Sequence, residues 1–316
     1  MIQVKVVRKI TAATDICAFE LASADGAALP GFTAGAHIDV HLADGLVRQY
    51  SLSNDPRETH RYVIGVLKEP QSRGGSIAMH ALAEGDTLFV SEPRNHFPLT
   101  PGATSTLLLA GGIGITPLLS MAQTLAAAGA AFELHYCTRE PARAAFRERI
   151  EAADLAASAR VYFDSASPEE RADLAAIIGA PDAGRHVYVC GPAGFIDAVL
   201  GTARNLGWPE THLHKEYFAA ATPPVIDGGV FTVKIASTGQ CVEIGEHQSV
   251  VESLAAAGIT IPTSCEQGVC GTCLTRVLAG QPEHRDMYLT DEERDANDQF
   301  LPCCSRSKSA ELVLDL

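Results

Sequence analysis

Three cysteines within nine positions constrain the fold of this chain more than any other feature of its sequence. Cys265, Cys270 and Cys273 lie in the stretch SCEQGVCGTCLTR, spaced C-x4-C-x2-C, and Cys303 follows after 29 further residues. Cysteines that only fill a core are usually scattered singly among apolar neighbours. This loop contains glycines and small polar residues instead, so the pattern indicates that the sulfur atoms are present as ligands.

The spacing is that of the plant-type [2Fe–2S] run, in which four thiolates hold the cluster. Gly268 and Gly271 can adopt positive φ and let the backbone wrap closely around an inorganic core. The N–H groups of such a loop can then point at the sulfurs and stabilise negative charge. We therefore predict a [2Fe–2S] cluster on the four cysteines. Cys304 is expected to be a bystander, because adjacent side chains diverge along an extended segment.

Two other uses of the cysteines compete with this prediction. A structural zinc site also takes four thiolates, but usually from two short C-x2–4-C pairs, and the adjacent Cys303 and Cys304 are poor geometry for one metal. A disulfide needs an oxidising compartment. The opening residues MIQVKVVRKI alternate like a strand and show no secretory signal, so we expect a reducing, cytoplasmic location.

Length and charge limit the remaining classes. With 316 residues, of which 47% are hydrophobic and 20% charged, the chain is expected to form two or three globular domains. Its formal net charge of −14 argues against nucleic acid or an anionic membrane as partner. Residues 228–316 hold six Lys or Arg and thirteen Asp or Glu, a net of −7. This acidity fits either a solvated surface or a docking face for a positively charged protein.

Hydrophobic periodicity divides the chain into three segments. Residues 1–102 alternate at period two between turn signals, which predicts a small antiparallel β-barrel. Residues 103–218 alternate apolar strands with helical stretches, which predicts a doubly wound α/β domain. Residues 219–229, AAATPPVIDGG, are typical of a linker. Residues 230–316 predict an α+β domain with a hairpin (VFTVKIAS and QCVEIG), a short helix (SVVESLAAAG) and a closing strand (ELVLDL).

Two strand ends of the α/β segment carry ligand-binding signals. In LLLAGGIGITPLL, the glycines at 111, 112 and 114 lie between an apolar strand and a helix for which Thr116 is the predicted N-cap and Gly129 the stop. Such a loop lets the backbone approach a pyrophosphate at a helix N-terminus, although a packing turn is the alternative. VYVCGPAGF places residues 190–192 at a strand's carboxyl end, where open α/β sheets bind ligands. Cys190 is then either an ordinary buried thiol or a neighbour of a nicotinamide ring.

The barrel segment carries two further signals. RQYSLS offers Arg48 and Tyr50 on one strand face and Ser51 on the other, and a flavin lying across the strand end could touch both sets. SRGGSIAMH places Gly74, Gly75 and Ser76 at the start of a predicted helix, which suits a second phosphate. The alternatives are a strand arginine in a surface ion pair and an ordinary glycine-rich turn.

The order of these motifs, R-x-Y-S and G-G-S, then G-G-x-G-x-T-P and C-G-P, then the cysteine loop, resembles the phthalate dioxygenase reductase family, including the vanillate O-demethylase reductases. The resemblance covers essentially the whole chain. It implies FMN in the barrel, NADH on the α/β domain and a [2Fe–2S] cluster in a β-grasp ferredoxin domain. HKEYF also resembles the segment that closes the nucleotide domain beside the flavin. The matching positions are Arg48, Tyr50, Ser51, Gly74, Gly75 and Ser76 for FMN; Gly111, Gly112, Gly114, Thr116, Cys190, Gly191 and Pro192 for the nucleotide; Glu216 and Phe218 beside the flavin; and Cys265, Cys270, Cys273 and Cys303 for the cluster.

The resemblance also implies an activity, that of an NADH-dependent flavin and iron–sulfur oxidoreductase. A nicotinamide delivers two electrons as a hydride, a cluster accepts one, and a flavin can exchange both, so the task of the protein is positioning and no side chain is expected to act as general acid or base. The implied partner is a Rieske-type aromatic oxygenase or demethylase, and a monomer is expected. Alternatives are the same electron-transfer chain serving a quaternary-amine oxygenase or a haem monooxygenase, and a zinc-stabilised redox-sensing or binding protein.

Overall fold

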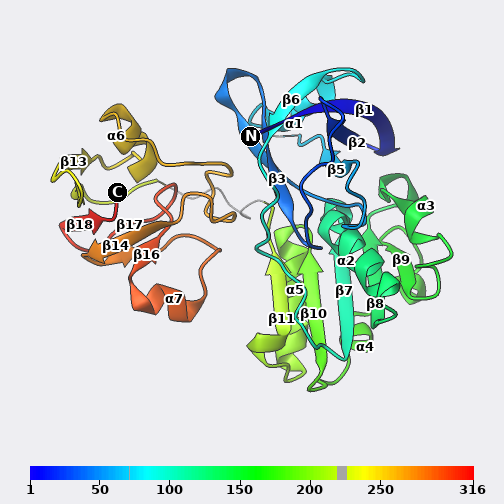
Figure 1. The fold of residues 1–316 in the computed structure, drawn as a ribbon. Helices are drawn as coiled ribbons and strands as arrows, with labels where there is room; N and C mark the ends of the chain where they lie inside the picture. Colours follow the sequence, from blue (N-terminus) through cyan, green and yellow to red (C-terminus); the bar gives the residue numbers. More distant parts are fainter. Residues whose placement is uncertain (71, 219–225) are drawn as a thin grey trace. The chain divides into compact units, whose positions relative to one another are not determined.

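The computed structural model describes residues 1–70, 72–218 and 226–316. The chain divides into two compact units, Met1–Glu216 and Tyr217–Leu316 (Figure 1). Most of the predicted linker, residues 219–225, lies outside the described residues. The first two predicted segments therefore share one compact unit, in which each has its own sheet.

The first lobe of unit 1 is the antiparallel barrel that the sequence predicts. Its six strands lie in the order β4-β3-β6-β1-β2-β5. An antiparallel bridge between Leu52 and Ile64 joins the two edge strands and closes the barrel. Alternation along the strands turns side chains such as Val4, Phe19 and Ile38 into a common core. The elements are β1 (Ile2–Ala13), β2 (Ile16–Ser23), β3 (His37–His41), β4 (Val47–Ser51), β5 (Tyr62–Leu67), α1 (Gly75–Ala81) and β6 (Thr87–Val90).

The second lobe is a parallel sheet with the strand order β11-β10-β7-β8-β9. β7 is central and almost fully buried, as its continuous apolar run predicts. The chain runs from β7 to one side through β8 and β9, then crosses to β10 and β11 on the other. Such a reversal opens a crevice at the carboxyl ends of β7 and β10. The elements are β7 (Ser105–Gly111), α2 (Ile115–Ala127), β8 (Ala131–Thr138), α3 (Arg147–Ile150), β9 (Ala159–Phe163), α4 (Leu174–Ile178), β10 (Arg185–Cys190), α5 (Ala193–Asn205) and β11 (Leu213–Glu216).

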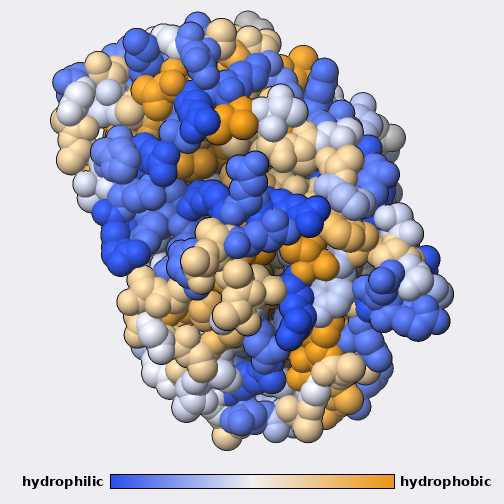
Figure 2. Space-filling view, turned by 90° about the vertical axis from the view of Figure 1, so that its right-hand side faces the viewer, coloured by the Kyte–Doolittle hydropathy of each residue, from blue (hydrophilic) through white to orange (hydrophobic). Residues whose placement is uncertain are grey.

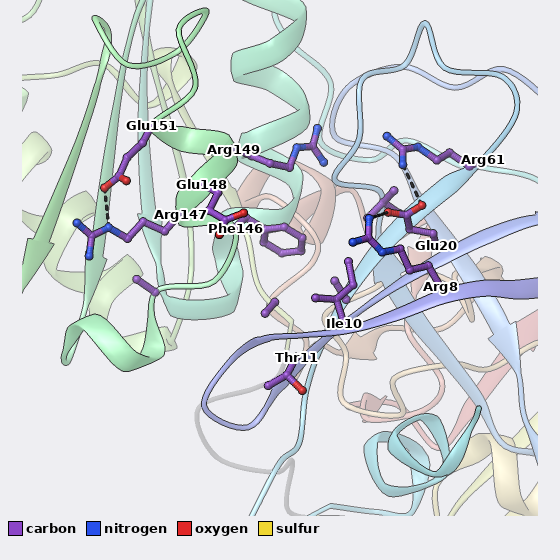
Figure 3. Close-up of a pocket in the computed structure, with 14 residues that line it drawn as sticks. Arg8, Ile10, Thr11, Glu20, Arg61, Phe146, Arg147, Glu148, Arg149 and Glu151 are labelled. Carbon is purple, nitrogen blue, oxygen red and sulfur yellow. Dashed lines mark hydrogen bonds and ion pairs between the residues drawn. The ribbon is translucent and has the colours of Figure 1, made fainter. Parts of the chain in front are cut away.

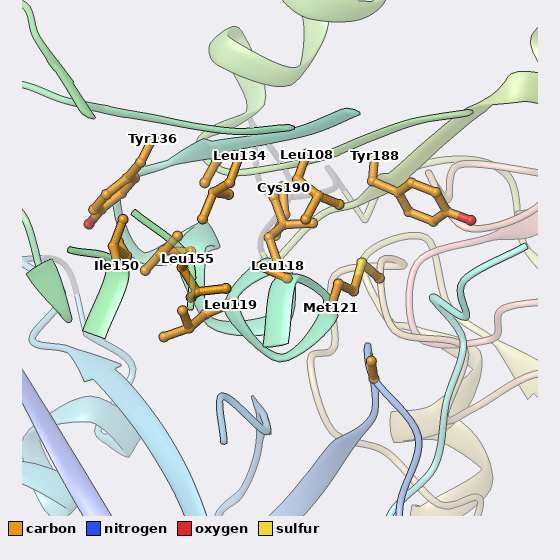
Figure 4. Close-up of a cluster of buried hydrophobic side chains, with 14 of the residues drawn as sticks. Leu108, Leu118, Leu119, Met121, Leu134, Tyr136, Ile150, Leu155, Tyr188 and Cys190 are labelled. Carbon is orange, nitrogen blue, oxygen red and sulfur yellow. The ribbon is translucent and has the colours of Figure 1, made fainter. Parts of the chain in front are cut away.

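Helix α2 packs against this sheet with a fully apolar face. Figure 4 shows Leu118, Leu119 and Met121 facing Leu108 and Leu134 from the strands. Burial of such side chains stabilises a fold by about 1.5–3 kcal/mol each. The packing fixes the position of the helix, and with it the glycine loop from which the helix starts.

The predicted start of α2 is wrong by two residues. A 3-10 turn, Gly112–Gly114, leads directly into the helix, whose N-cap is Gly114. Thr116 therefore lies inside the first turn, where its hydroxyl donates to the Ile113 carbonyl at 3.1 Å rather than to a free backbone N–H. The predicted stop is confirmed, because Gly129 follows the last turn with φ +63°, a conformation that glycine adopts easily.

Unit 2 is the α+β domain that the sequence predicts. Its main sheet has the order β13-β12-β18-β14-β16, with a separate ladder of β15 and β17. The predicted hairpin of β12 and β13 is antiparallel, and the closing strand β18 pairs in parallel with β12, the first strand of the unit. The elements are β12 (Phe231–Ile235), β13 (Cys241–Ile244), α6 (Val250–Ala256), β14 (Thr275–Ala279), β15 (Pro282–Glu283), α7 (Asp291–Ala296), β16 (Gln299–Phe300), β17 (Arg306–Ser307) and β18 (Glu311–Leu314).

Both helices of unit 2 begin with a reciprocal capping box. Ser249 and Glu252 form the box of α6, and Thr290 and Glu293 form the box of α7. Each pair satisfies two backbone N–H groups that the first turn leaves without partners. Within the described residues, no helix is long and apolar enough to span a membrane.

Candidate functional site

The carboxyl ends of β7 and β10 approach each other so closely that only glycine fits. A Cβ on Gly114 would lie 2.2 Å from the Cys190 carbonyl oxygen, and one on Gly191 would lie 2.9 Å from the Gly111 Cα. Gly111 has little more room, since a Cβ there would meet the Phe195 ring at 2.8 Å. Packing alone explains these three glycines, as the alternative interpretation of the loop allows.

Gly112 is not explained by packing. A Cβ at this position would meet no atom within 4 Å, but the residue has φ +53°. Its backbone therefore borders open space at the start of α2, at the edge of the sheet where the strand order reverses. Pro192 is the N-cap of the neighbouring helix α5, so the ends of both strands lead into helix N-termini, which favour negative charge.

Three predicted residues from different segments meet at this edge of the sheet. Cys190 and Glu216 pair across β10 and β11, and the Ser51 hydroxyl at the end of β4 donates to Glu216 Oε2 at 3.4 Å. The barrel and the parallel sheet therefore touch at the ends of their strands. The structure brings together the predicted flavin strand and the predicted nicotinamide strand within unit 1.

Burial sets the charge state of this meeting point. Part of Glu216 reaches solvent, but burial of its carboxyl raises the pKa to about 8, against a smaller opposing effect of the Ser51 hydrogen bond. Burial, together with the Glu216 charge, raises the pKa of the Cys190 thiol well above its ordinary value. Cys190 is therefore a neutral thiol, and Glu216 holds its proton near neutral pH.

Arg48 lies across the glycine turn that precedes α1. Its guanidinium donates to the Arg73 carbonyl at 2.9 Å and to the Val47 carbonyl at 2.8 Å. A Cβ on Gly75 would lie 2.5 Å from the Arg48 Cγ, and Gly74 has φ +88°. The arginine and the glycine turn are thus one local structure, with a cation packed against the turn's backbone.

The other two barrel residues are placed differently. Burial raises the pKa of Tyr50, which stays a neutral phenol. The Ser76 hydroxyl accepts from the Glu69 N–H at 3.1 Å and donates to the Ser72 hydroxyl at 2.9 Å, so it shapes the turn around α1.

Phe218 is 38% exposed and follows Tyr217 at the start of unit 2, beyond the last residue of unit 1.

Polar residues of α2 that the sequence analysis missed join the two lobes of unit 1. Ser120 donates to the Asn54 carbonyl at 2.9 Å, and Gln123 donates to the Ser53 carbonyl at 3.1 Å. Arg149 donates in turn to the Gln123 side-chain oxygen. Ser53 and Asn54 follow the R-x-Y-S strand after Leu52, and all four linking residues are buried. Ser120 and Gln123 in the largely apolar stretch TPLLSMAQTL are the signal that was available.

The four predicted cluster cysteines face one another in unit 2. Cys265 is hydrogen-bonded to Cys270 and Cys303, and Cys273 to Cys303. These contacts lower the pKa of Cys265 and raise those of Cys270 and Cys303. The Gln267 N–H also donates to the Cys265 sulfur at 3.3 Å. In the described part of the chain, no three His, Cys, Asp or Glu side chains form a ready site for a single ion, and the cysteines form no disulfide.

The chemistry of this donor set fits a cationic inorganic core. Thiols that share protons in pairs can all become thiolates only where positive charge is supplied among them. Sulfur donors are the ligands that iron–sulfur clusters take. The residues present therefore fit the predicted [2Fe–2S] group.

Both loop glycines are required by their surroundings as well as by their backbone. Gly268 and Gly271 each have φ +71°. A Cβ on Gly271 would lie 2.4 Å from the Tyr288 ring, and one on Gly268 would lie 2.5 Å from the Cys304 sulfur. Cys304 is fully buried and packs behind the loop, where its thiol donates to the Leu301 carbonyl at 3.7 Å.

Comparison with known proteins places these features among redox proteins. Residues 233–308 match the family described as 2Fe-2S iron-sulfur cluster binding domain, and residues 91–213 match the dimethylamine monooxygenase subunit DmmA-like N-terminal domain. The chain is 53% identical over 317 residues to a vanillate O-demethylase oxidoreductase of Pseudomonas sp. (strain HR199 / DSM 7063), with all of both chains covered.

Two solved structures are similar over nearly the whole chain. Phthalate dioxygenase reductase, described as a modular structure for electron transfer from pyridine nucleotides to [2Fe–2S], matches with a TM-score of 0.76 and 41% identity over 99% of this chain and 97% of its own. An intact type IV self-sufficient cytochrome P450 monooxygenase matches with a TM-score of 0.89 and 38% identity over 100% of this chain but 41% of its own.

Proposed function

The chain belongs to the reductase family of vanillate O-demethylase oxidoreductase and phthalate dioxygenase reductase, and on that basis we propose that it carries electrons from NADH through FMN and a [2Fe–2S] cluster to an oxygenase component. The observation that carries the proposal is the meeting of Ser51, Cys190 and Glu216. This contact supports the proposal because it joins the predicted flavin strand of the barrel to the predicted nicotinamide end of the parallel sheet.

Each lobe of unit 1 has groups suited to hold one of the two organic cofactors. Arg48 supplies positive charge for the FMN phosphate, and the turn at Gly74 and Gly75, on which Arg48 lies, supplies backbone N–H groups. The open backbone at Gly112 suits the NADH pyrophosphate. In unit 2, the four facing cysteines hold the cluster.

Bound in the barrel, FMN would supply the exchange between the two-electron chemistry of NADH and a one-electron carrier. The surrounding residues position the cofactors and keep charge away from them, and they do not take part in the reaction themselves. The Glu216 carboxyl is protonated, and the Cys190 thiol beside it is neutral and fully buried in the core, so a ring bound at this strand end would face no buried ion. The close approach of Gly111, Gly114 and Gly191 fixes the distance between the loop and the ring site.

An anaerobic visible spectrum, recorded before and after NADH is added, tests the proposal. We expect flavin bands with a broad iron–sulfur shoulder, both bleached by NADH and restored by a one-electron acceptor. Extraction and chromatography of the flavin should give FMN rather than FAD, and NADPH should reduce the protein poorly. A protein that contains zinc and stays without visible absorbance after reconstitution with iron, sulfide and flavin would refute the electron-transfer function.

For the electron acceptor, we propose a Rieske-type aromatic oxygenase or demethylase, which the resemblance of the motifs implies. The acidic segment 228–316, with its net charge of −7, supports docking on a basic face of that partner. Electron transfer to the oxygenase should then slow as ionic strength rises, while flavin reduction by NADH should not change.

A haem monooxygenase is the second candidate acceptor, because the similar P450 monooxygenase is matched over the whole of this chain. Purified Rieske oxygenase and purified P450 offered to the same reduced protein distinguish the two. The true acceptor should be reduced at least about tenfold faster than the other.

A further inference from the structure

A cavity of about 570 Å³ lies between the barrel and the α/β lobe of unit 1, and it involves none of the residues assigned above to FMN, NADH or the cluster. One wall comes from β1, β2 and β5, and the other from residues 144–151 around α3 (Figure 3). A band of hydrophilic residues crosses the middle of the molecular face shown in Figure 2. The volume is within the range of about 300–1,000 Å³ that is usual for small-molecule sites.

Arg149 is the unusual cation of this cavity. Its one hydrogen bond goes to the neutral Gln123 amide, and among the described residues it forms no ion pair. Burial lowers its pKa and the Arg61 charge acts in the same direction, whereas the carboxylates of Glu58, Asp154 and Glu20 oppose the shift from beyond ion-pair distance. The other cations have acidic partners, since Arg61 pairs with Glu20 at 2.9 Å and Arg147 with Glu151 at 2.5 Å. Arg149 therefore keeps N–H donors for a group that the chain itself does not supply.

The charge of the lining limits what that group is. Four arginines and three glutamates line the cavity, which leaves one net positive charge. Glu58, outside the lining, pairs with Arg61 at 2.8 Å, so Arg149 is the lining guanidinium whose close partner is neutral. A singly charged anion suits this site better than a nucleotide phosphate, whose several charges would face Glu20, Glu148 and Glu151.

The rest of the wall is apolar. Ile10, Val63 and Phe146 line the cavity beside Ala18 and Ala144. Phe146 has φ +57°, a left-handed conformation that is costly for a bulky residue. Its ring edge is wedged against β5, where a Cβ on Gly65 would approach it to 3.0 Å. The packing therefore holds a strained aromatic residue at the cavity, a feature that clusters at ligand sites.

We propose that this cavity binds a small aromatic carboxylate, with the carboxyl group on Arg149 and the ring against Phe146, Ile10 and Val63. A planar guanidinium with free N–H donors suits a carboxylate. An aromatic ring gains from apolar and edge contacts with the phenylalanine. The inference concerns binding only and does not depend on the proposed electron-transfer function.

Calorimetric titration with benzoate tests the proposal, with neutral benzamide as the matched probe. We expect benzoate to bind and benzamide to bind at least about tenfold more weakly. Arg149→Met should weaken benzoate binding at least about tenfold, while Arg147→Met, which removes an exposed and already paired cation, should change it less than about twofold. NADH affinity should be the same with and without benzoate.

A second pair of variants leaves Arg149 and its contact with Gln123 intact. Ile10→Glu places a negative charge in the lining and should abolish benzoate binding, whereas Ile10→Gln, with the same shape, should bind within about threefold of the original protein. Equal binding by the glutamate and glutamine variants would overturn the proposal. Competition between benzoate and NADH, equal affinity for benzamide, or no benzoate binding would do the same.

Discussion

The Ser51 hydroxyl, at the end of a barrel strand, donates a hydrogen bond of 3.4 Å to the Glu216 carboxyl, at the end of a parallel strand. The contact joins residues that are 165 positions apart in the chain. It fixes the ends of two different sheets side by side and puts the Glu216 proton at the proposed flavin and nicotinamide site.

The pKa of Glu216 predicts how the stability of the flavin-free protein depends on pH. In the folded protein the pKa is raised from 4.5 to about 8, so between these values the folded state binds more protons than the unfolded state. The free energy of unfolding should therefore fall as pH rises from 4.5 through 8, by roughly 2–4 kcal/mol from this group. Urea unfolding at pH 5.5 and 8.5 measures the change, and Glu216→Gln should remove it. An unchanged slope in the glutamine variant would assign the effect to other groups.

Cys303 and Cys304 should differ in their effect on the cluster. Cys303→Ser removes one of four facing sulfurs, so we expect iron content and iron–sulfur absorbance to be lost. Cys304→Ala removes a buried thiol behind the loop and should cost about 1–2 kcal/mol of stability while the cluster is kept. Iron analysis and the visible spectrum of both variants decide the matter. Cluster loss in the Cys304 variant alone would exchange the two roles.

Close backbone approach predicts a selective effect at Gly114. An added methyl group would meet the Cys190 carbonyl oxygen at 2.2 Å, and because both partners are backbone, the loop has to move away from β10. Gly114→Ala should lower the efficiency of flavin reduction by NADH at least about tenfold. Gly194→Ala is the matched control, since its Cβ has open space in α5, and stopped-flow reduction should proceed normally. Equal rates in the two variants would contradict a role for the approach of β7 and β10.

Gly75 predicts a corresponding effect on the flavin. A Cβ there would overlap the Arg48 side chain at 2.5 Å, so Gly75→Ala should displace the guanidinium and weaken FMN binding about tenfold or more. Gly31→Ala, in a barrel loop with nothing within 4 Å, should retain FMN. Fluorescence titration of flavin-free protein gives both affinities. Unchanged affinity in the Gly75 variant would remove Arg48 from the flavin site.

How far the sequence predicts this molecule depends on whether a feature is local. The cysteine spacing, the apolar run of β7 and the hairpin of unit 2 are local patterns, and the elements appear where they were expected. The start of α2 was misplaced because Thr116 has the chemistry of an N-cap, whereas the preceding 3-10 turn had already begun the helical path. The contact of Ser51 with Glu216 cannot be predicted from the sequence of either segment alone, because it depends on how the two sheets pack.

The links between α2 and the barrel are also nonlocal, and they lead to the last prediction. Gln123 connects the Ser53 carbonyl, two residues after the predicted flavin strand, with the helix that begins at the predicted nucleotide loop. Gln123→Glu keeps an acceptor for Arg149 but, when ionised, has no N–H to donate to Ser53; Gln123→Leu loses both contacts. If the Ser53 link sets the distance between flavin and nicotinamide, both variants should slow flavin reduction at saturating NADH about tenfold.

Two further readouts separate positioning from general stability in these Gln123 variants. The isotope effect with 4-deuterated NADH should rise towards its full value as hydride transfer becomes rate-limiting, and reduction of the cluster by photoreduced flavin should keep its rate. Loss of thermal stability with an unchanged rate and isotope effect would mean that Gln123 only holds the lobes together. A slow rate in the leucine variant alone would assign the effect to Arg149, because only that variant leaves the guanidinium without its buried partner.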